Sequence, residues 1–136
     1  MERAVSDRHL LAAGTLVVLV ASAGSLFFSE VWGLQPCSLC WYQRIATFPL
    51  VVVLGVAAWE HRPGIYRTAL PLSVAGVAVG AYHSWLQATA GGACTLGGGC
   101  ATVEFRLQPV GLTLPNLGLL AMLSVTALLV AVWWRQ

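Results

Sequence analysis

The residues best suited to chemistry in this sequence are four cysteines, which form two close pairs. Cys37 and Cys40 make a Cys-x-x-Cys motif. Cys94 and Cys100 are separated by five residues, of which three are glycines. Close cysteines can form a disulfide, bind a soft metal or exchange electrons with another dithiol. The glycine run predicts a short, pliable loop, which suits a disulfide that a partner protein must reach.

The residues around the first pair favour reactive cysteines over inert ones. Pro36 is suited to the start of a helix. On that helix Cys37, Cys40 and Arg44 share one face, because they are spaced by three and then four residues. Unpaired backbone N–H groups of the first turn, the helix dipole and the arginine charge all favour a thiolate. The thiolate is the reactive form, so the pattern indicates a redox-active pair.

Composition limits the kind of protein that can carry these cysteines. Of the 136 residues, 58% are hydrophobic and 9% are charged, against about 25% charged in soluble domains. A soluble domain of this length cannot hide so much apolar surface. Seven arginines, no lysine and five acidic residues give a net charge of +2, which is too small to indicate a nucleic-acid partner. These values exclude an ordinary soluble domain and a disordered chain.

Four long apolar segments predict an all-α membrane protein, a bundle of four transmembrane helices in one domain, 1–136. A membrane-spanning helix needs about 20 mostly apolar residues, and the segments are continuous instead of alternating as in a β-barrel. The first is longer than the roughly 7–15 apolar residues of a signal peptide, so we expect it to be retained. The predicted helices are 10–28, 39–59, 68–86 and 114–134, with outer loops at 29–38 and 87–113.

Arginine positions predict the orientation. Five arginines fall in the two terminal segments and the loop between the second and third helices, whereas the long opposite loop has only Arg106. The positive-inside rule therefore predicts that the N- and C-termini are cytoplasmic. All four cysteines then face the extracytoplasmic side, where disulfides form and persist.

Simpler interpretations of the same residues stay open at this point. Two outer disulfides could only brace the loops, and four thiolates could hold zinc, although an oxidising compartment disfavours such a cluster and we expect no metal. Arg44 could be an anchor that reaches the headgroups, and His83 an interfacial polar residue. Gly76, Gly80 and Ser84 form a small-residue stripe that predicts a helix-packing face.

Longer motifs add a family resemblance that covers essentially the whole chain. The run from Pro36 to Ile45, Pro-Cys-Ser-Leu-Cys-Trp-Tyr-Gln-Arg-Ile, is followed by Phe-Pro-Leu at 48–50. Tyr-His-Ser-Trp-Leu-Gln at 82–87 and Leu-Thr-Leu-Pro at 112–115 complete the pattern. The sequence resembles the DsbB/BdbC family of membrane thiol:quinone oxidoreductases. The short spacing of its second cysteine pair is closer to the compact BdbC branch.

The resemblance implies an electron relay through both pairs. A reduced thioredoxin-fold oxidase of the DsbA/BdbD type attacks the Cys94–Cys100 disulfide from the extracytoplasmic side through a mixed disulfide. By position, Cys94 resembles the cysteine that bonds to the partner, and Cys100 resembles its loop partner. The loop pair then passes its electrons to Cys37 and Cys40.

The resemblance also implies a quinone cofactor, ubiquinone or menaquinone, from the pool in a bacterial cytoplasmic membrane. Cys40 resembles the cysteine that contacts the quinone, and Arg44 and His83 match family residues beside it. The alternatives are a vitamin K epoxide reductase-like enzyme or a non-catalytic membrane protein with two bracing disulfides. Trp-Tyr-Gln-Arg directly after a Cys-x-x-Cys that opens the second of four helices favours the DsbB/BdbC interpretation.

Overall fold

The computed structural model describes residues 2–89 and 106–136, nearly all of them in four long helices. A two-stranded hairpin and two short helical turns connect them. The elements are α1 (Glu2–Leu26), the π-helical turn η1 (Phe27–Val31), α2 (Ser38–Glu60), the 3₁₀ turn η2 (Pro63–Ile65), α3 (Tyr66–Thr89), β1 (Arg106–Leu107), β2 (Leu112–Thr113) and α4 (Leu114–Arg135).

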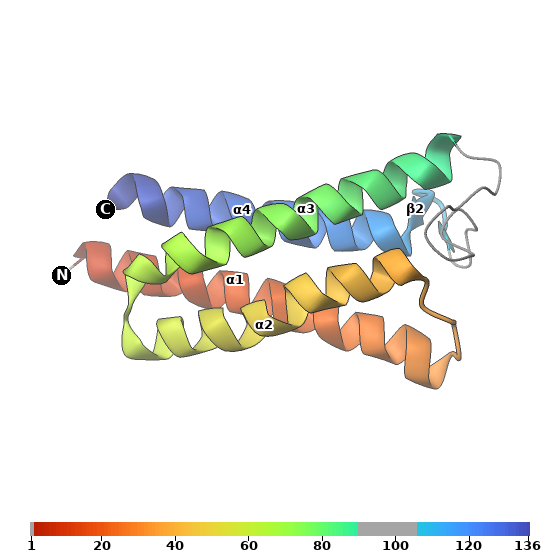
Figure 1. Ribbon diagram of the computed structural model, residues 1–136. Helices are drawn as coiled ribbons and strands as arrows, with labels where there is room; N and C mark the ends of the chain where they lie inside the picture. Colours follow the sequence, from red (N-terminus) through yellow and green to blue (C-terminus); the bar gives the residue numbers. More distant parts are fainter. Residues whose placement is uncertain (1, 90–105) are drawn as a thin grey trace.

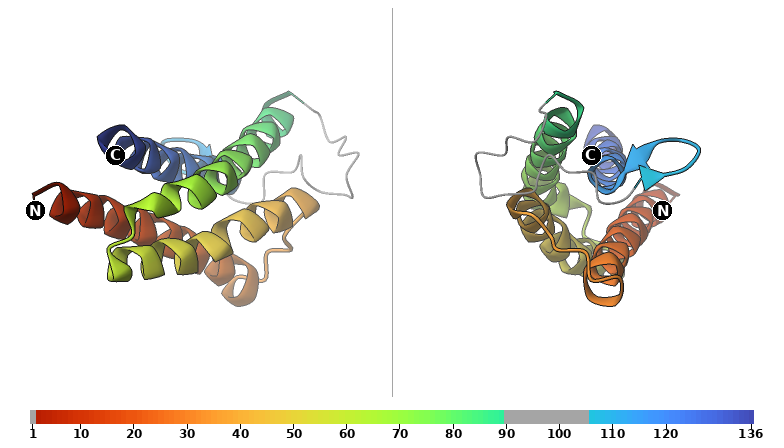
Figure 2. Two further views of the ribbon diagram at one scale, coloured as in Figure 1. Left: turned by 60° about the vertical axis from the view of Figure 1, so that its left-hand side comes forward. Right: turned by 90° about the vertical axis from the view of Figure 1, so that its right-hand side faces the viewer.

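The helices form a bundle in which each packs mainly on two neighbours, in the ring order α1, α2, α3, α4 and back to α1. Figure 1 shows both termini and the α2–α3 connection at one end of the bundle. The start of α2, the end of α3 and the β1–β2 hairpin lie at the other end, and Figure 2 shows that end face on. The predicted four-helix architecture is confirmed.

All four helices are long and apolar enough to cross a membrane. The shortest span has 22 residues, or about 33 Å at 1.5 Å per residue, which matches a hydrocarbon core of about 30 Å. The prediction placed the start of the first helix eight residues too late, because hydropathy marks the apolar span and not the charged turns before it. Those turns contain Arg8, a good helix former, and Asp7, which accepts a hydrogen bond from Gln136 Nε2 at 2.9 Å.

The small-residue stripe of α3 packs against α4, so the predicted packing face is found. Gly76 and Gly80 are both buried. A Cβ at Gly76 would come within 2.8 Å of the sulfur of Met122, and one at Gly80 within 3.3 Å of the Leu119 backbone. Small residues therefore let these two helices approach closely. The core of the bundle is aliphatic and includes Leu11, Val18, Leu50, Leu54, Val125 and Leu129.

Local contacts fix the end of the bundle where α2 and α4 begin. Thr113 precedes α4 with an extended backbone, and Pro115 occupies the first turn, where its missing N–H is tolerated. The Thr113 hydroxyl donates to Gln87 Oε1 at 2.8 Å, which ties the start of α4 to the last turns of α3. β1 and β2 pair antiparallel immediately before α4, in a stretch that the sequence predicted only as loop.

Candidate redox site and adjoining cavity

The Cys-x-x-Cys pair lies at the start of α2. Cys37 is the N-cap residue, with an extended backbone, and its carbonyl accepts the N–H of Trp41 at 3.1 Å. Cys40 is in the first turn, and the two sulfur atoms are 3.3 Å apart. A covalent disulfide has a bond of about 2.05 Å, so an oxidant could join the two sulfurs after only a small movement of either side chain. The helix start therefore brings the predicted pair together.

His83 comes from α3 and approaches Cys37. Its Nε2 is 3.7 Å from Cys37 Sγ, and the side chain is 1% exposed. Cys37 also packs against the cluster formed by Leu39 and Leu86. At this distance the imidazole can exchange a proton with the thiol, because a ring nitrogen can either donate or accept a hydrogen.

The same three side chains are the group of donors that could hold a metal ion in the described part of the chain. The sulfurs of Cys37 and Cys40 and a ring nitrogen of His83 all lie within 4.8 Å of one another. Two thiolates and an imidazole are ligands that zinc accepts. The expectation that the protein has no metal stays a prediction.

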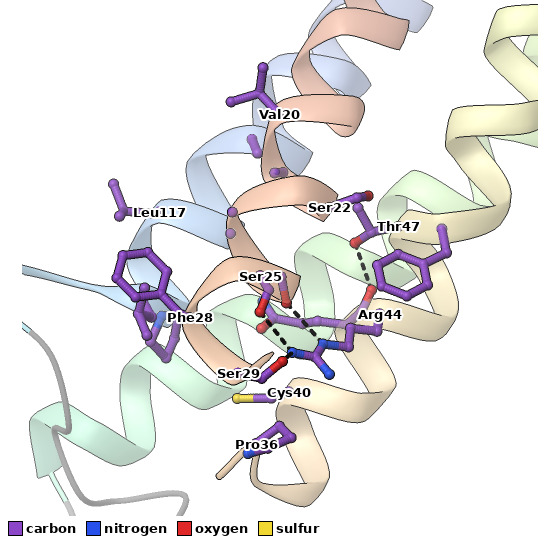
Figure 3. A pocket seen from close by; sticks show the side chains of 18 of the residues that line it. Val20, Ser22, Ser25, Phe28, Ser29, Pro36, Cys40, Arg44, Thr47 and Leu117 are labelled. Atoms are coloured by element: carbon purple, nitrogen blue, oxygen red, sulfur yellow. Dashed lines mark hydrogen bonds between the residues drawn. The ribbon is translucent and has the colours of Figure 1, made fainter. Parts of the chain in front are cut away.

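Arg44 lies one turn after Cys40 and is buried, with 7% of its surface exposed. Its Nε donates to Ser25 Oγ at 2.9 Å, and its Nη2 donates to the Ser25 carbonyl and to Ser29 Oγ, both at 2.8 Å. These bonds hold the guanidinium against α1 and η1, as Figure 3 shows. An anchor in the headgroups would instead be exposed. Within the described residues, no hydrogen bond involves Nη1, so its two N–H groups remain for a ligand.

A cavity of about 640 Å³ adjoins this side of the cysteine pair. Its walls come from α1, η1, α2, α4 and the connection at residues 34–36 (Figure 3). Most of the wall is apolar, and Cys40 and Arg44 both contribute to it. The apolar lining residues include Leu16, Val17, Val20, Phe28, Phe48, Leu114, Leu117 and Met122.

The family resemblance implies that Arg44 and His83 both lie beside a cofactor, but they differ in their relation to this cavity. Arg44 lines the cavity, whereas His83 is not among the lining residues and contacts Cys37 instead. The role of His83 beside the cofactor stays a prediction from the resemblance, and its contact with Cys37 favours a role on that thiol instead. Sequence reasoning also missed Ser25 and Ser29, although two serines four residues apart at the end of an apolar span were an available signal.

Cys94 and Cys100 lie outside the described residues. The chain leaves the described part after Thr89 and returns at Arg106. The end of α3 and the β1–β2 hairpin are at the same end of the bundle as the start of α2 (Figure 1). The described residues on either side of this stretch are thus at the end of the bundle where the first pair lies.

Comparison with known proteins shows which family the chain belongs to. The family model described as disulfide bond formation protein DsbB matches residues 7–133. A "Probable disulfide formation protein" from Metapseudomonas resinovorans is 36% identical, over 91% of this chain and 89% of its own. One with the same name from Deinococcus radiodurans is 37% identical, over 89% and 85%.

A shorter match extends the comparison to Bacillus subtilis, whose "Disulfide bond formation protein C" is 41% identical over 54% of this chain and 53% of its own. No solved structure matches the chain. The family model covers most of the sequence, and two relatives align over nearly their whole length. The chain therefore belongs to the DsbB family of disulfide bond formation proteins.

Proposed function

We propose that this protein is a protein-dithiol:quinone oxidoreductase, which reoxidises a thioredoxin-fold partner and passes the electrons to a membrane quinone. Membership of the DsbB family already implies a membrane oxidoreductase in disulfide formation. The position of Cys40 is the observation that supports electron transfer to a quinone. One sulfur of the redox pair lies in the wall of an apolar cavity, directly beside a buried arginine.

The cavity residues suit a quinone. The volume of about 640 Å³ lies within the range of roughly 300–1,000 Å³ typical of small-molecule sites. The apolar wall suits a ring with an isoprenoid tail, and the Nη1 group of Arg44 can donate to a ring oxygen. Leu16 and Val20 line the cavity and are also 61% and 70% exposed on the surface of α1. The cavity thus extends toward the surface that faces lipid, which is the source of a lipid-soluble cofactor.

The relay begins at the loop pair. A thiolate of the reduced partner attacks Cys94, the Cys94–Cys100 bond breaks, and Cys100 leaves as a thiolate. The partner's second thiol then attacks the mixed disulfide, so the partner is oxidised and the loop pair carries its two electrons and two protons. The loop dithiol reduces the Cys37–Cys40 disulfide by the same two exchanges and becomes a disulfide again.

The Cys37–Cys40 dithiol then returns to its disulfide form and gives up two electrons and two protons. A bound quinone supplies the two-electron, two-proton acceptor for this step. We propose that His83 Nε2 takes the proton of Cys37 as the Cys37–Cys40 bond forms and two electrons pass to the acceptor, since Nε2 is 3.7 Å from Cys37 Sγ. Arg44 places a fixed positive charge beside Cys40, where it stabilises a thiolate and negative charge that develops in the cavity.

The direction of the relay requires the cysteine end to face the extracytoplasmic side of a bacterial cytoplasmic membrane. In the described residues, Arg62 and Arg67 lie at the opposite end, near the α2–α3 connection, together with Arg135 at the end of α4. This distribution agrees with cytoplasmic termini under the positive-inside rule.

The test uses the purified protein in lipid nanodiscs with a reduced thioredoxin-fold oxidase and a short-tailed quinone. We expect one quinone to be consumed for each partner dithiol that is oxidised. Quinone absorbance measures the first quantity, and thiol titration measures the second. Cys40→Ser and Cys94→Ser should each abolish consumption and leave the helical circular dichroism unchanged. If the wild type consumes no quinone and the variants instead lose thermal stability, the cysteines brace the loops and the proposal is wrong.

A further inference from the structure

Gln43 is a polar residue of α2 whose side chain reaches into the interior of the bundle. A Cβ at Gly80 on α3 would lie 2.8 Å from its Nε2, and one at Gly118 on α4 would lie 3.2 Å from the same atom. The amide therefore occupies a slot that is open because α3 and α4 both have glycine at that point. The side chain also lines the cavity that holds Cys40 and Arg44.

Packing alone does not explain an amide in this slot. Gln43 Nε2 is buried and has no hydrogen-bond partner in the described part of the chain. A buried donor without an acceptor destabilises the folded state, and an apolar side chain of similar shape avoids that loss. Methionine has nearly the same length and flexibility and would fill the slot. An acceptor that enters the adjoining cavity would satisfy the amide.

We infer that Gln43 is a hydrogen-bonding ligand of the quinone head group, an inference that rests on the proposed function of the cavity. The terminal torsion of a glutamine side chain is broad and roughly two-fold, so its N–H₂ and C=O groups can exchange positions in one slot. The N–H₂ group donates to a ring carbonyl of the oxidised cofactor. The C=O group accepts from a ring hydroxyl of the reduced cofactor. Arg44 can only donate, whereas the Gln43 amide can form a hydrogen bond with either redox state.

The test measures binding directly, with no turnover. A short-tailed ubiquinone analogue and its quinol are titrated into the purified full chain, and tryptophan fluorescence quenching gives the Kd. We expect Gln43→Met to weaken binding of both forms by about threefold to tenfold, the effect of losing one neutral hydrogen bond. We also expect its melting temperature without quinone to equal or exceed that of the wild type, because the unpaired amide is gone. Gln108→Met makes the same change at an exposed turn and should alter neither value.

Each outcome decides a different point. Unchanged Kd values for Gln43→Met overturn the inference. Weaker binding together with a lower melting temperature without quinone also overturns it, because that combination indicates a packing role for Gln43. Gln43→Asn keeps the amide but shortens its reach by one methylene, and it should weaken binding in the same way if the methionine variant does not fold. A wild type that binds no quinone at all would overturn the proposed function itself.

Discussion

The two sulfurs of the Cys-x-x-Cys pair are 3.3 Å apart, yet their surroundings differ. Cys37 faces α3, where it meets the buried imidazole of His83 and packs against Leu39 and Leu86. Cys40 faces the cavity between α1, α2 and α4, beside the guanidinium of Arg44. We name these the thiol side (Cys37 and His83) and the cavity side (Cys40 and Arg44).

The difference follows from helix geometry and ring order. Residues three apart on a helix point in directions that differ by about 60°, and α2 lies between α1 and α3 in the bundle. One sulfur is therefore turned toward α3 and the other toward α1 and α4. A single turn of helix can thus separate exchange with protein thiols from contact with a lipid-soluble acceptor, and each of the following variants tests that separation.

The largest effect is expected from loss of either sulfur. Cys37→Ser and Cys40→Ser should each reduce turnover by at least about 10³-fold, as loss of a catalytic nucleophile does. The sides should differ in protection against alkylation by a maleimide. Bound quinone should slow alkylation of Cys40 in the Cys37→Ser variant and leave Cys37 unaffected in Cys40→Ser. Equal protection of both sulfurs would contradict the separation.

A core substitution should affect neither side. Leu54 is 1% exposed in the aliphatic core, so Leu54→Ala should lower the free energy of unfolding by about 2–4 kcal/mol through the cavity it leaves. Denaturant unfolding in detergent micelles measures this loss. Leu120→Ala, at a half-exposed position, is the control and should change stability much less. The Kd for quinone, corrected for the folded fraction, should stay at the wild-type value. A large rise in this Kd would show that the core substitution changes the cavity side.

On the cavity side, Arg44→Gln should raise the KM for quinone by about 10- to 100-fold, the usual effect of losing hydrogen bonds from a charged group. The rate of disulfide exchange with the partner should stay within about twofold, since the guanidinium is bonded to Ser25 and Ser29 and not to the thiol side. Stopped-flow measurements separate the two steps. Arg62→Gln, exposed at the other end of the bundle, is the matched control. An unchanged KM for quinone would mean that Arg44 has only a structural role.

On the thiol side, His83→Gln should slow reoxidation of the Cys37–Cys40 dithiol by about tenfold. This effect is smaller than the roughly 10²–10⁴-fold typical of general-base catalysis, because a thiol ionises in part without a base. Quinone Kd should remain within about twofold of the wild type. Single-turnover kinetics at saturating quinone measures the first value, and fluorescence titration measures the second. Weaker quinone binding with an unchanged rate would place His83 on the cavity side.

The sequence predicts the four helices well because long apolar runs have few other solutions in a bilayer. It also predicts that Cys40 lies beside both Cys37 and Arg44, because that proximity depends only on the local geometry of one helix. The single face predicted for all three residues is not found, since Cys37 turns toward α3 and Cys40 and Arg44 line the cavity. The helix ends were predicted less well, as the early start of α1 at Glu2 shows, because charged turns extend a helix without any hydropathy signal.

Contacts between helices could not be predicted in the same way. Whether His83 meets Cys37 or the cavity depends on the ring order of the helices and the rotation of α3, and no single segment determines either of these. The same holds for the serines of α1 that bind Arg44 and for the slot that Gly80 and Gly118 leave for Gln43. These features require the assembled bundle.

The most direct test of the account is photolabelling with a photoreactive quinone, followed by peptide mass spectrometry. We expect labels on α1 and η1 within residues 16–29, on α2 within 40–48 and on α4 within 114–122, all removed by excess unlabelled quinone. We expect no protected label on α3 around His83. Protected labelling confined to α3, or none near Cys40 and Arg44, would contradict it.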